Sequence, residues 1–237
     1  MKTVKVIDLE TRAISKIPAS ELTRHYVRAQ SKVGGKMDAY VDLRAIKRRL
    51  AEHQAELLRK KDYDAYLFSF DGHKRFLYFD RIASQMDNAS YWHCLGMVWS
   101  MIETSHEHAG IWLAHFKSKR PQREKLMNAR ERKRLKALPD VLTIYRGCAR
   151  TKHADGISWT LSRRVAEFFV NYSNSARRAL LCQHKQSTTG IIVSGQCYKR
   201  DVLAYFSGRK EKEIVIDAAN VFEKQIHRID CTPAFDL

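Results

Sequence analysis

The stretch GRKEKEIVID (208–217) places two glutamates, Glu211 and Glu213, at the start of an apolar run that is typical of a buried strand. Side chains alternate faces along a strand, so two residues one position apart point into the same space. Carboxylates that close resist joint ionisation unless a cation or a bound substrate compensates. The stretch therefore indicates either a functional carboxylate pair or a solvated strand end whose charge is offset by the neighbouring Arg and Lys side chains.

The chain carries a large excess of positive charge. Its 237 residues include 43 Lys and Arg against 26 Asp and Glu, a formal net charge of +17, and 44% are hydrophobic, enough for a packed core. Such a charge attracts polyanions and says nothing about fold. The densest stretch, KSKRPQREKLMNARERKRLK (117–136), holds ten basic and two acidic residues. It is either a solvated helix face or a contact with nucleic acid.

Cysteine usage and hydropathy bear on the compartment. The five cysteines are odd in number and form no Cys-x-x-Cys pair, which argues against a disulfide framework or a zinc knuckle and fits a reducing cytosol. The start, MKTVKVIDLE (1–10), has no apolar stretch typical of a signal peptide, and no apolar run in the chain is long enough to span a membrane. We therefore expect a cytoplasmic protein with no membrane partner.

The first half of the chain has mainly helical patterns. LRAIKRRLAEHQAELLRKK (43–61) repeats apolar residues along one stripe with cations opposite, and YWHCLGMVWSMIETSHEH (91–108) has the same spacing. Between them, YLFSFDGHKRFLYF (66–79) predicts an aromatic hairpin, because Asp-Gly is a strong turn signal between two aromatic runs. We assign residues 1–136 to a basic, mainly helical N-terminal region.

Beyond Pro139 the pattern changes from helix to strand. Four runs predict strands: VLTIYRG (141–147), GISWT (156–160), GIIVSGQCY (190–198) and EIVID (213–217). Ser162 can cap the one helix that the spacing predicts among them. We assign residues 137–237 to a mostly β domain, so the expected fold class is α+β.

Three motifs occur in order in this second region. Tyr-Arg-Gly ends a predicted strand at Arg146 and Gly147, Ser-Trp-Thr begins at Ser158, and Glu-Lys-Glu opens a later strand at Glu211. Ser158 follows Arg146 by twelve positions and precedes Glu213 by fifty-five. This arrangement resembles the Arg-Ser-Glu class of mono-ADP-ribosyltransferases, over less than half of the chain. The resemblance implies a split β-sandwich that binds NAD⁺, as substrate, in a cleft between two small sheets.

The resemblance also implies a division of roles. NAD⁺ loses nicotinamide through an oxocarbenium-like state, and a preorganised carboxylate beside the ribose stabilises the growing charge. Glu213 matches the glutamate that does this, and Glu211 matches the one that faces the acceptor and orients or deprotonates it. Arg146 matches the arginine that grips a phosphate of the dinucleotide, for which a planar cation with five donors is suited.

The remaining motif residues complete the implied NAD⁺ site. Ser158 matches the serine that fixes the nicotinamide ribose and steadies the catalytic glutamate. Trp159 departs from the usual Ser-Thr-Ser triplet, and either packs into the core beneath the cleft or stacks on the nicotinamide. Thr160 keeps the third hydroxyl. Gly147 lets the nicotinamide amide approach bare backbone, because glycine permits close contact.

Other residues with reactive or metal-binding side chains are discounted. His106 and His108 would lie on different faces of a helix and have no second ligand pair, so we expect no metal site. Cys148 follows the Tyr-Arg-Gly motif, but no His/Asn pattern marks it as a nucleophile, and a buried thiol is the default.

The acceptor is open between two classes. In the resembled class, Glu-x-Glu accompanies arginine acceptors, whereas Gln-x-Glu goes with other acceptors, including guanine in nucleic acid. The charge of +17 favours nucleic acid, because each neutralised phosphate strengthens binding by counterion release. We expect RNA rather than DNA, since single-stranded bases are reached without flipping.

The expected protein is thus a bacterial or phage toxin or effector that modifies RNA, for which an antitoxin partner would be a natural counterpart. The alternatives are a transferase that modifies protein arginines and a catalytically silent nucleic-acid-binding protein that keeps the sandwich.

Overall fold

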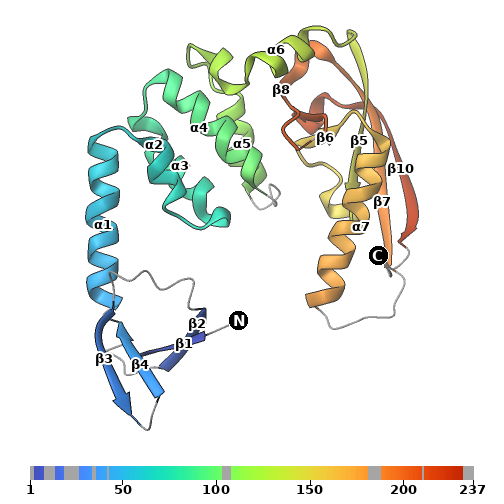
Figure 1. The fold of residues 1–237 in the computed structure, drawn as a ribbon. Helices are drawn as coiled ribbons and strands as arrows, with labels where there is room; N and C mark the ends of the chain where they lie inside the picture. The colour runs from blue at the N-terminus through green and yellow to red at the C-terminus, as the bar shows by residue number, and fades with distance from the viewer. Residues whose placement is uncertain are drawn as a thin grey trace. The chain divides into compact units, whose positions relative to one another are not determined.

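The computed structural model describes residues 3–7, 14–18, 27–33, 36–41, 43–102, 108–180, 188–209 and 211–231 (Figure 1). The chain divides into two compact units, Met1–Ser69 and Phe70–Leu237. The boundary expected at 136/137 therefore falls inside the second unit. That unit contains the predicted strands and also the helices that precede them.

The first unit begins with strands rather than helices. Its described elements are β1 (Thr3–Ile7), β2 (Ile14–Pro18), β3 (Val27–Val33), β4 (Lys36–Val41), α1 (Leu43–Arg59) and α2 (Tyr63–Phe68). β1 pairs with β2 and β3 pairs with β4, both antiparallel. The helix predicted over 43–61 is confirmed. The prediction of a mainly helical region is wrong for those of the first 41 residues that the structure describes, because they form strands. Their alternation is interrupted by polar residues, so the strand pattern is weak.

The aromatic hairpin predicted over 66–79 is wrong. The segment forms the end of α2, a short 3₁₀ turn (Gly72–Lys74) and most of α3 (Arg75–Ile82). Phe76 and Phe79 lie three residues apart on the buried side of α3, and the Phe76 ring stacks on Trp112 at a centroid distance of 3.7 Å. Short aromatic runs fit a period of two or of 3.6, and packing against the neighbouring helices selects the helix.

Three helices of the second unit share an aromatic core: α3, α4 (Asn88–Met101) and α5 (Ala109–Phe116). A fourth, α6 (Ala129–Lys136), packs its Leu135 against the core of the sheet. The predicted helix at 91–108 thus begins earlier and ends at Met101, where Ile102 adopts an extended conformation. Trp99 packs edge-on against Trp112 and Phe116, and all three side chains are buried. This core fixes the C-terminal end of α4.

A six-stranded antiparallel sheet forms the rest of the second unit, in the order β10-β7-β5-β6-β9-β8. Its strands are β5 (Val141–Cys148), β6 (Ser158–Thr160), β7 (Thr188–Tyr198), β8 (Val202–Phe206), β9 (Glu213–Ile216) and β10 (Phe222–Cys231). The four strands predicted from the sequence are confirmed, and β8 and β10 are additional. Among the described strands the sheet does not close into a barrel, because β10 and β8 remain its two edges. The fold class is α+β.

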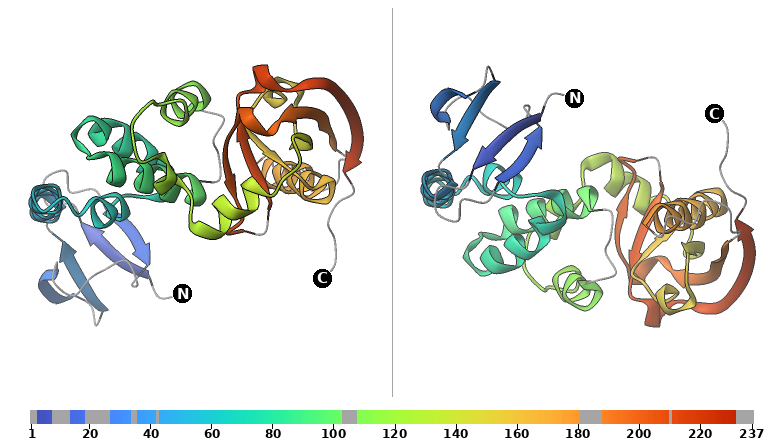
Figure 2. Two further views of the ribbon diagram at one scale, coloured as in Figure 1. Left: turned by 90° about the horizontal axis from the view of Figure 1, so that it is seen from above. Right: turned by 90° about the horizontal axis from the view of Figure 1, so that it is seen from below.

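One helix, α7 (Arg163–Leu180), covers one face of this sheet (Figure 2). Ala166 and Val170 pack against Ile192 of β7 in a small buried cluster. The opposite face contributes to a larger core that includes Ile144, Trp159 and other buried side chains of the sheet, with Met127 and Leu135 packed against it. Neither α7 nor any other described helix combines the length and apolarity that a membrane crossing requires.

Candidate active site

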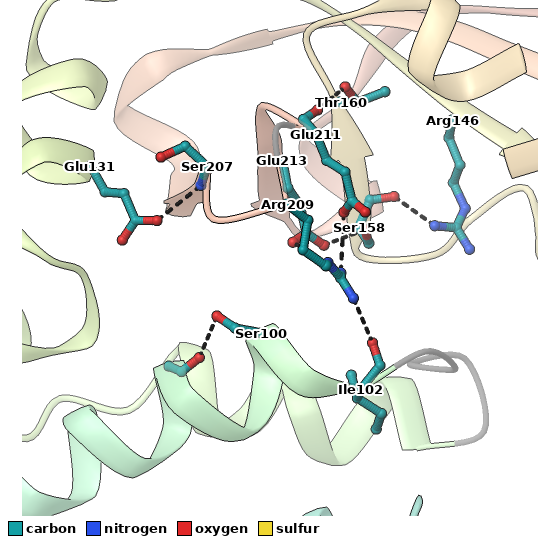
Figure 3. Close-up of polar contacts among 11 residues, drawn as sticks. Ser100, Ile102, Glu131, Arg146, Ser158, Thr160, Ser207, Arg209, Glu211 and Glu213 are labelled. Carbon is teal, nitrogen blue, oxygen red and sulfur yellow. Dashed lines mark hydrogen bonds and ion pairs between the residues drawn. The ribbon is translucent and has the colours of Figure 1, made fainter. Parts of the chain in front are cut away.

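The three motifs lie on neighbouring strands. β6 pairs with β5 through Tyr145 and Thr160, and it pairs with β9 through Thr160 and Glu213 and through Ser158 and Val215. The short strand β6 therefore places the Ser-Trp-Thr residues between the Tyr-Arg-Gly strand and the Glu-Lys-Glu strand. Figure 3 shows the side chains that converge there.

Glu213 is a buried carboxylate held by a serine. Its residue is 6% exposed, and the Ser158 hydroxyl donates a 2.6 Å hydrogen bond to Glu213 Oε1. Burial raises the pKa of Glu213, while the Ser158 hydrogen bond and the charge of Arg209 oppose that rise. A solvated strand end is therefore excluded for Glu213. The site combines a costly buried charge with a donor that fixes its orientation.

Glu211 reaches the same space by a route different from strand alternation. β9 begins only at Glu213, and Lys212 has a left-handed φ of 49°, so the triplet bends rather than extends. The Thr160 hydroxyl donates a 2.6 Å hydrogen bond to the Glu211 backbone oxygen and anchors this bend to β6. Burial raises the pKa of Glu211, and its ion pair with Arg209 lowers it. Non-glycine residues in the left-handed region cost conformational energy and cluster at active sites and ligand clamps.

Arg209 joins the two glutamates. Its Nη2 lies 3.1 Å from Glu211 Oε2 and 4.0 Å from Glu213 Oε2, and its Nη1 donates a 3.2 Å hydrogen bond to the Ile102 backbone oxygen (Figure 3). Together with Ser100, Phe206 and Gly208, these three charged side chains line a pocket of about 20 Å³. That volume corresponds to about one water molecule. The end of α4 thus forms one wall of the candidate site.

Trp99 of α4 is a site residue that the sequence did not indicate. Its side chain is buried, and its indole N–H has no hydrogen-bond partner of standard geometry among the described residues. The same side chain lies near enough to Glu213 to lower the pKa of that carboxyl. A Trp in an apolar helix is ordinarily part of the core, so no sequence signal could have assigned it to the site.

Glu131 supports the site from the basic stretch. It is 6% exposed, forms a capping box with Asn128 at the start of α6, and accepts a 2.9 Å hydrogen bond from the backbone N–H of Ser207. Ser207 follows β8 and leads toward the Glu-Lys-Glu triplet. The Asn-x-x-Glu spacing is the signal that could have identified this residue.

Arg146 braces the backbone of the site. Its Nε donates to the His153 oxygen at 2.9 Å and its Nη1 to the Ser158 oxygen at 2.6 Å. A Cβ on Gly156 would lie 2.2 Å from the Arg146 guanidinium, so that glycine leaves room for it. Arg146 does not line the small pocket. Its observed role is to hold Ser158 in position.

Trp159 and Thr160 have different environments although they are adjacent. Trp159 is 2% exposed, belongs to the sheet core and donates its indole N–H to the Gly156 oxygen at 2.8 Å. Of the two positions considered for this side chain, the core is the observed one. Thr160 is buried beneath the Glu211 bend.

Gly147 has a packing role. A Cβ at this position would lie 1.9 Å from the Ala166 backbone oxygen of α7. The glycine therefore allows the helix to approach β5 closely, which gives a structural reason for its presence besides the expected contact with a nicotinamide.

Gly147→Ala should lower the free energy of unfolding by about 1–3 kcal/mol, because the added methyl overpacks a backbone contact. Gly110→Ala is the matched control. Gly110 lies in α5 with open space around the added methyl, so this change should be neutral or stabilising. Chemical denaturation of both variants measures the difference. Equal stability of Gly147→Ala and the unmodified chain would contradict the close approach of α7.

The basic stretch 117–136 is partly structural. Arg120 donates to the backbone oxygens of Met86 and Ala83, and Arg123 donates to the Leu203 oxygen. Arg132 likewise contacts backbone oxygens that precede α6. A second group of cations is exposed and bonded to no other described side chain: Lys119, Lys125, Arg130, Lys133, Arg134 and Lys136. Only this second group is available for a polyanion.

Among the described residues, the discounted side chains form no competing site. Cys148 is buried, its Sγ donates to the His153 oxygen, and burial raises the pKa of the thiol, which keeps it unreactive. Within the described part of the chain, no group of three or more His, Cys, Asp or Glu side chains could hold a metal ion. His106 lies outside the described residues.

Comparisons of this chain with protein-family models, with curated proteins and with solved structures find no match.

Proposed function

We propose that this chain is an NAD⁺-dependent mono-ADP-ribosyltransferase of the Arg-Ser-Glu type, that its sheet is part of a split β-sandwich, and that it transfers ADP-ribose to nucleic acid, RNA in preference to DNA. One observation carries the proposal: the buried Glu213 carboxylate, held by a 2.6 Å hydrogen bond from Ser158, lies beside a second carboxylate, Glu211. Glu213 is buried and Glu211 is half-buried, so each carboxylate costs desolvation energy that packing alone does not offset. A reaction that develops positive charge gives the pair a role.

In the first chemical step, the bond between ribose C1′ and the nicotinamide nitrogen breaks. The electron pair of that bond leaves with nicotinamide. Positive charge then grows on the ribose ring. Glu213 would stabilise this charge as a carboxylate, fixed in orientation by Ser158 and screened from water. Burial raises the pKa of Glu213, so the neighbouring Arg209 cation helps to keep it ionised.

The second step forms a bond between C1′ and a nitrogen of the acceptor, whose proton passes to Glu211. Burial raises the pKa of Glu211, which makes its carboxylate a stronger base than an exposed glutamate. A pocket of about 20 Å³ does not admit NAD⁺. Binding of NAD⁺ would therefore require this pocket to widen.

Exposed aromatic and basic side chains favour a nucleic-acid acceptor. On α7, Phe168 is 60% and Tyr172 is 50% exposed, with ring centroids 6.0 Å apart and nearly parallel planes. Arg164 is exposed one turn earlier on the same face. A basic surface with exposed rings is what single-stranded nucleic acid requires, because bases stack on aromatics while cations neutralise phosphates. Modification of RNA by such an enzyme is the activity of a toxin or effector in the cytoplasm, with an antitoxin as its natural partner.

A labelling experiment tests the acceptor class. The chain is incubated with NAD⁺ that is radiolabelled in its adenylate part and with cell lysate, and the product is treated with RNase, DNase or protease. Loss of the macromolecular label only with RNase is the expected result. Release by protease would instead identify a protein acceptor, an alternative that the pairing of Glu211 with a guanidinium favours. Absence of any NAD⁺ cleavage, with or without acceptor, would identify a silent binding protein.

The exposed cations of α6 give a separate prediction about RNA binding. Changing Arg130, Lys133 and Arg134 to Gln should reduce the slope of log affinity against log salt by about 2, because each phosphate contact on a single strand contributes about 0.7. Titration of a labelled single-stranded RNA at several salt concentrations measures the slope.

The matched control removes the same charge from another exposed helix. Lys47, Arg48 and Arg49 of α1 are exposed and become Gln in that variant. Equal slopes for the α6 and α1 variants would mean that net charge, and no local contact by α6, determines RNA binding.

A further inference from the structure

A guanidinium occupies the position where the proposed reaction needs its acceptor. Arg209 Nη2 lies 3.1 Å from the Glu211 carboxylate and 4.0 Å from the Glu213 carboxylate. The Arg209 side chain is 41% exposed, so it is not a fully buried counter-ion. Its second contact, from Nη1 to the Ile102 oxygen, fixes the guanidinium against the end of α4, where Arg209 lines the pocket.

The geometry of the proposed transfer defines what an acceptor must satisfy. The nucleophilic nitrogen must approach C1′ of a ribose held beside Glu213, at about 3–3.5 Å in a near-attack arrangement. The same nitrogen must be within hydrogen-bond reach of the base that takes its proton, here Glu211. Nη2 meets the second condition at 3.1 Å and lies next to the carboxylate that marks the ribose position.

We propose that Arg209 is a self-modification site, at which the chain transfers ADP-ribose from NAD⁺ to its own Nη2. The inference rests on the proposed transferase activity and adds a specific acceptor to it. A guanidinium NH₂ and the exocyclic amine of a base are both planar NH₂ groups on a conjugated carbon, so one pocket serves both.

The step is balanced without any further reactant. The bond between C1′ and the nicotinamide nitrogen breaks first, and nicotinamide leaves with the electron pair as a neutral molecule. The bond between Nη2 and C1′ then forms. One Nη2 proton passes to Glu211. The nicotinamide ring of NAD⁺ carries a positive charge and leaves neutral, so that charge passes to the guanidinium with the ribose. The guanidinium loses an equal charge with its proton, and the modified group therefore remains positive.

The experiment uses the purified full chain and NAD⁺ alone. Intact-mass measurement records the added ADP-ribose, peptide mapping by mass spectrometry locates it, and released nicotinamide is measured in parallel. We expect one ADP-ribose per chain at Arg209, formed at a fractional rate independent of protein concentration, as a reaction within one molecule requires.

Two variants sharpen the test. Arg209→Lys keeps the positive charge but removes the planar NH₂ group, and should lower self-labelling at least tenfold relative to nicotinamide release in the same sample. Arg163→Lys is the matched control, because Arg163 forms a 3.1 Å ion pair with Glu167 that is exposed, and neither residue lines the pocket. It should label as the unmodified chain does.

The outcomes separate this inference from the proposed function. Nicotinamide release with no label, or with a label at another residue, would overturn self-modification at Arg209 while the transferase proposal stands. A fractional rate that rises with protein concentration would also overturn it, since the acceptor would then be a second molecule. No nicotinamide release in any sample would overturn both.

Discussion

Glu213→Gln should reduce the rate of NAD⁺ cleavage by about 10²–10³-fold, the scale of one preorganised electrostatic contact. Glutamine keeps the shape and can still accept the Ser158 hydrogen bond, but it lacks the charge that stabilises an oxocarbenium-like state. Binding of NAD⁺ in the ground state should change little. Nicotinamide release measures the first quantity and calorimetry the second.

The same substitution should stabilise the fold. Burial raises the pKa of Glu213, so the unfolded chain binds fewer protons than the folded chain and stability falls as pH rises through the interval between the two pKa values. Glutamine does not ionise, so the Glu213→Gln variant does not lose this part of its stability as pH rises. At neutral pH, Glu213→Gln should therefore have a higher free energy of unfolding than the unmodified chain. The difference should shrink as pH falls toward 4.5, the ordinary glutamate value, and should be lost below it.

Glu223→Gln is the control, because Glu223 is an exposed glutamate on β10. It should leave the rate of NAD⁺ cleavage unchanged. A Glu213→Gln variant that cleaves NAD⁺ at the normal rate would remove Glu213 from the chemistry, whatever its effect on stability.

Much of the sheet could be predicted from the sequence, because buried strands are runs of β-branched residues. Ile144 and Ile214 lie in such runs and are buried as expected. β10 was missed for the converse reason: it is an edge strand, and most of its described side chains face water, so its sequence is polar. The first unit was misjudged because its strands carry no strong alternation.

The candidate site was predicted only where local spacing determines it. Ser158 and Glu213 meet because β6 and β9 are paired, and both strands were recognisable. The left-handed Lys212 was not foreseeable, since nothing in the residue type requires a positive φ. Trp99 reaches the site from a distant helix through tertiary packing alone, which no short stretch of sequence encodes.

Glu211→Gln should separate the two reactions of the site. Transfer to an acceptor should fall by about 10²–10⁴-fold, the range of general-base catalysis, because the acceptor's proton has no base to receive it. Hydrolysis of NAD⁺ by water should persist, since Glu213 remains and the cleavage step does not use Glu211. The backbone should not move, because the bend is held through the Glu211 carbonyl oxygen and Thr160 rather than through the carboxylate.

Nicotinamide release without acceptor and label transfer to single-stranded RNA are measured on the same preparation. Glu167→Gln is the matched control, because it also removes a glutamate that is paired with an arginine, but at an exposed position on α7. Protonation of Glu211 in the unmodified chain should abolish transfer below a pH that lies above the usual glutamate range, since burial raises its pKa. The ratio of transfer to hydrolysis cancels the dependence on Glu213 that both reactions share, and in that ratio the acid limb should be absent for Glu211→Gln. Equal loss of hydrolysis in Glu211→Gln and Glu213→Gln would show that the two carboxylates act as a unit rather than on the acceptor and the ribose separately.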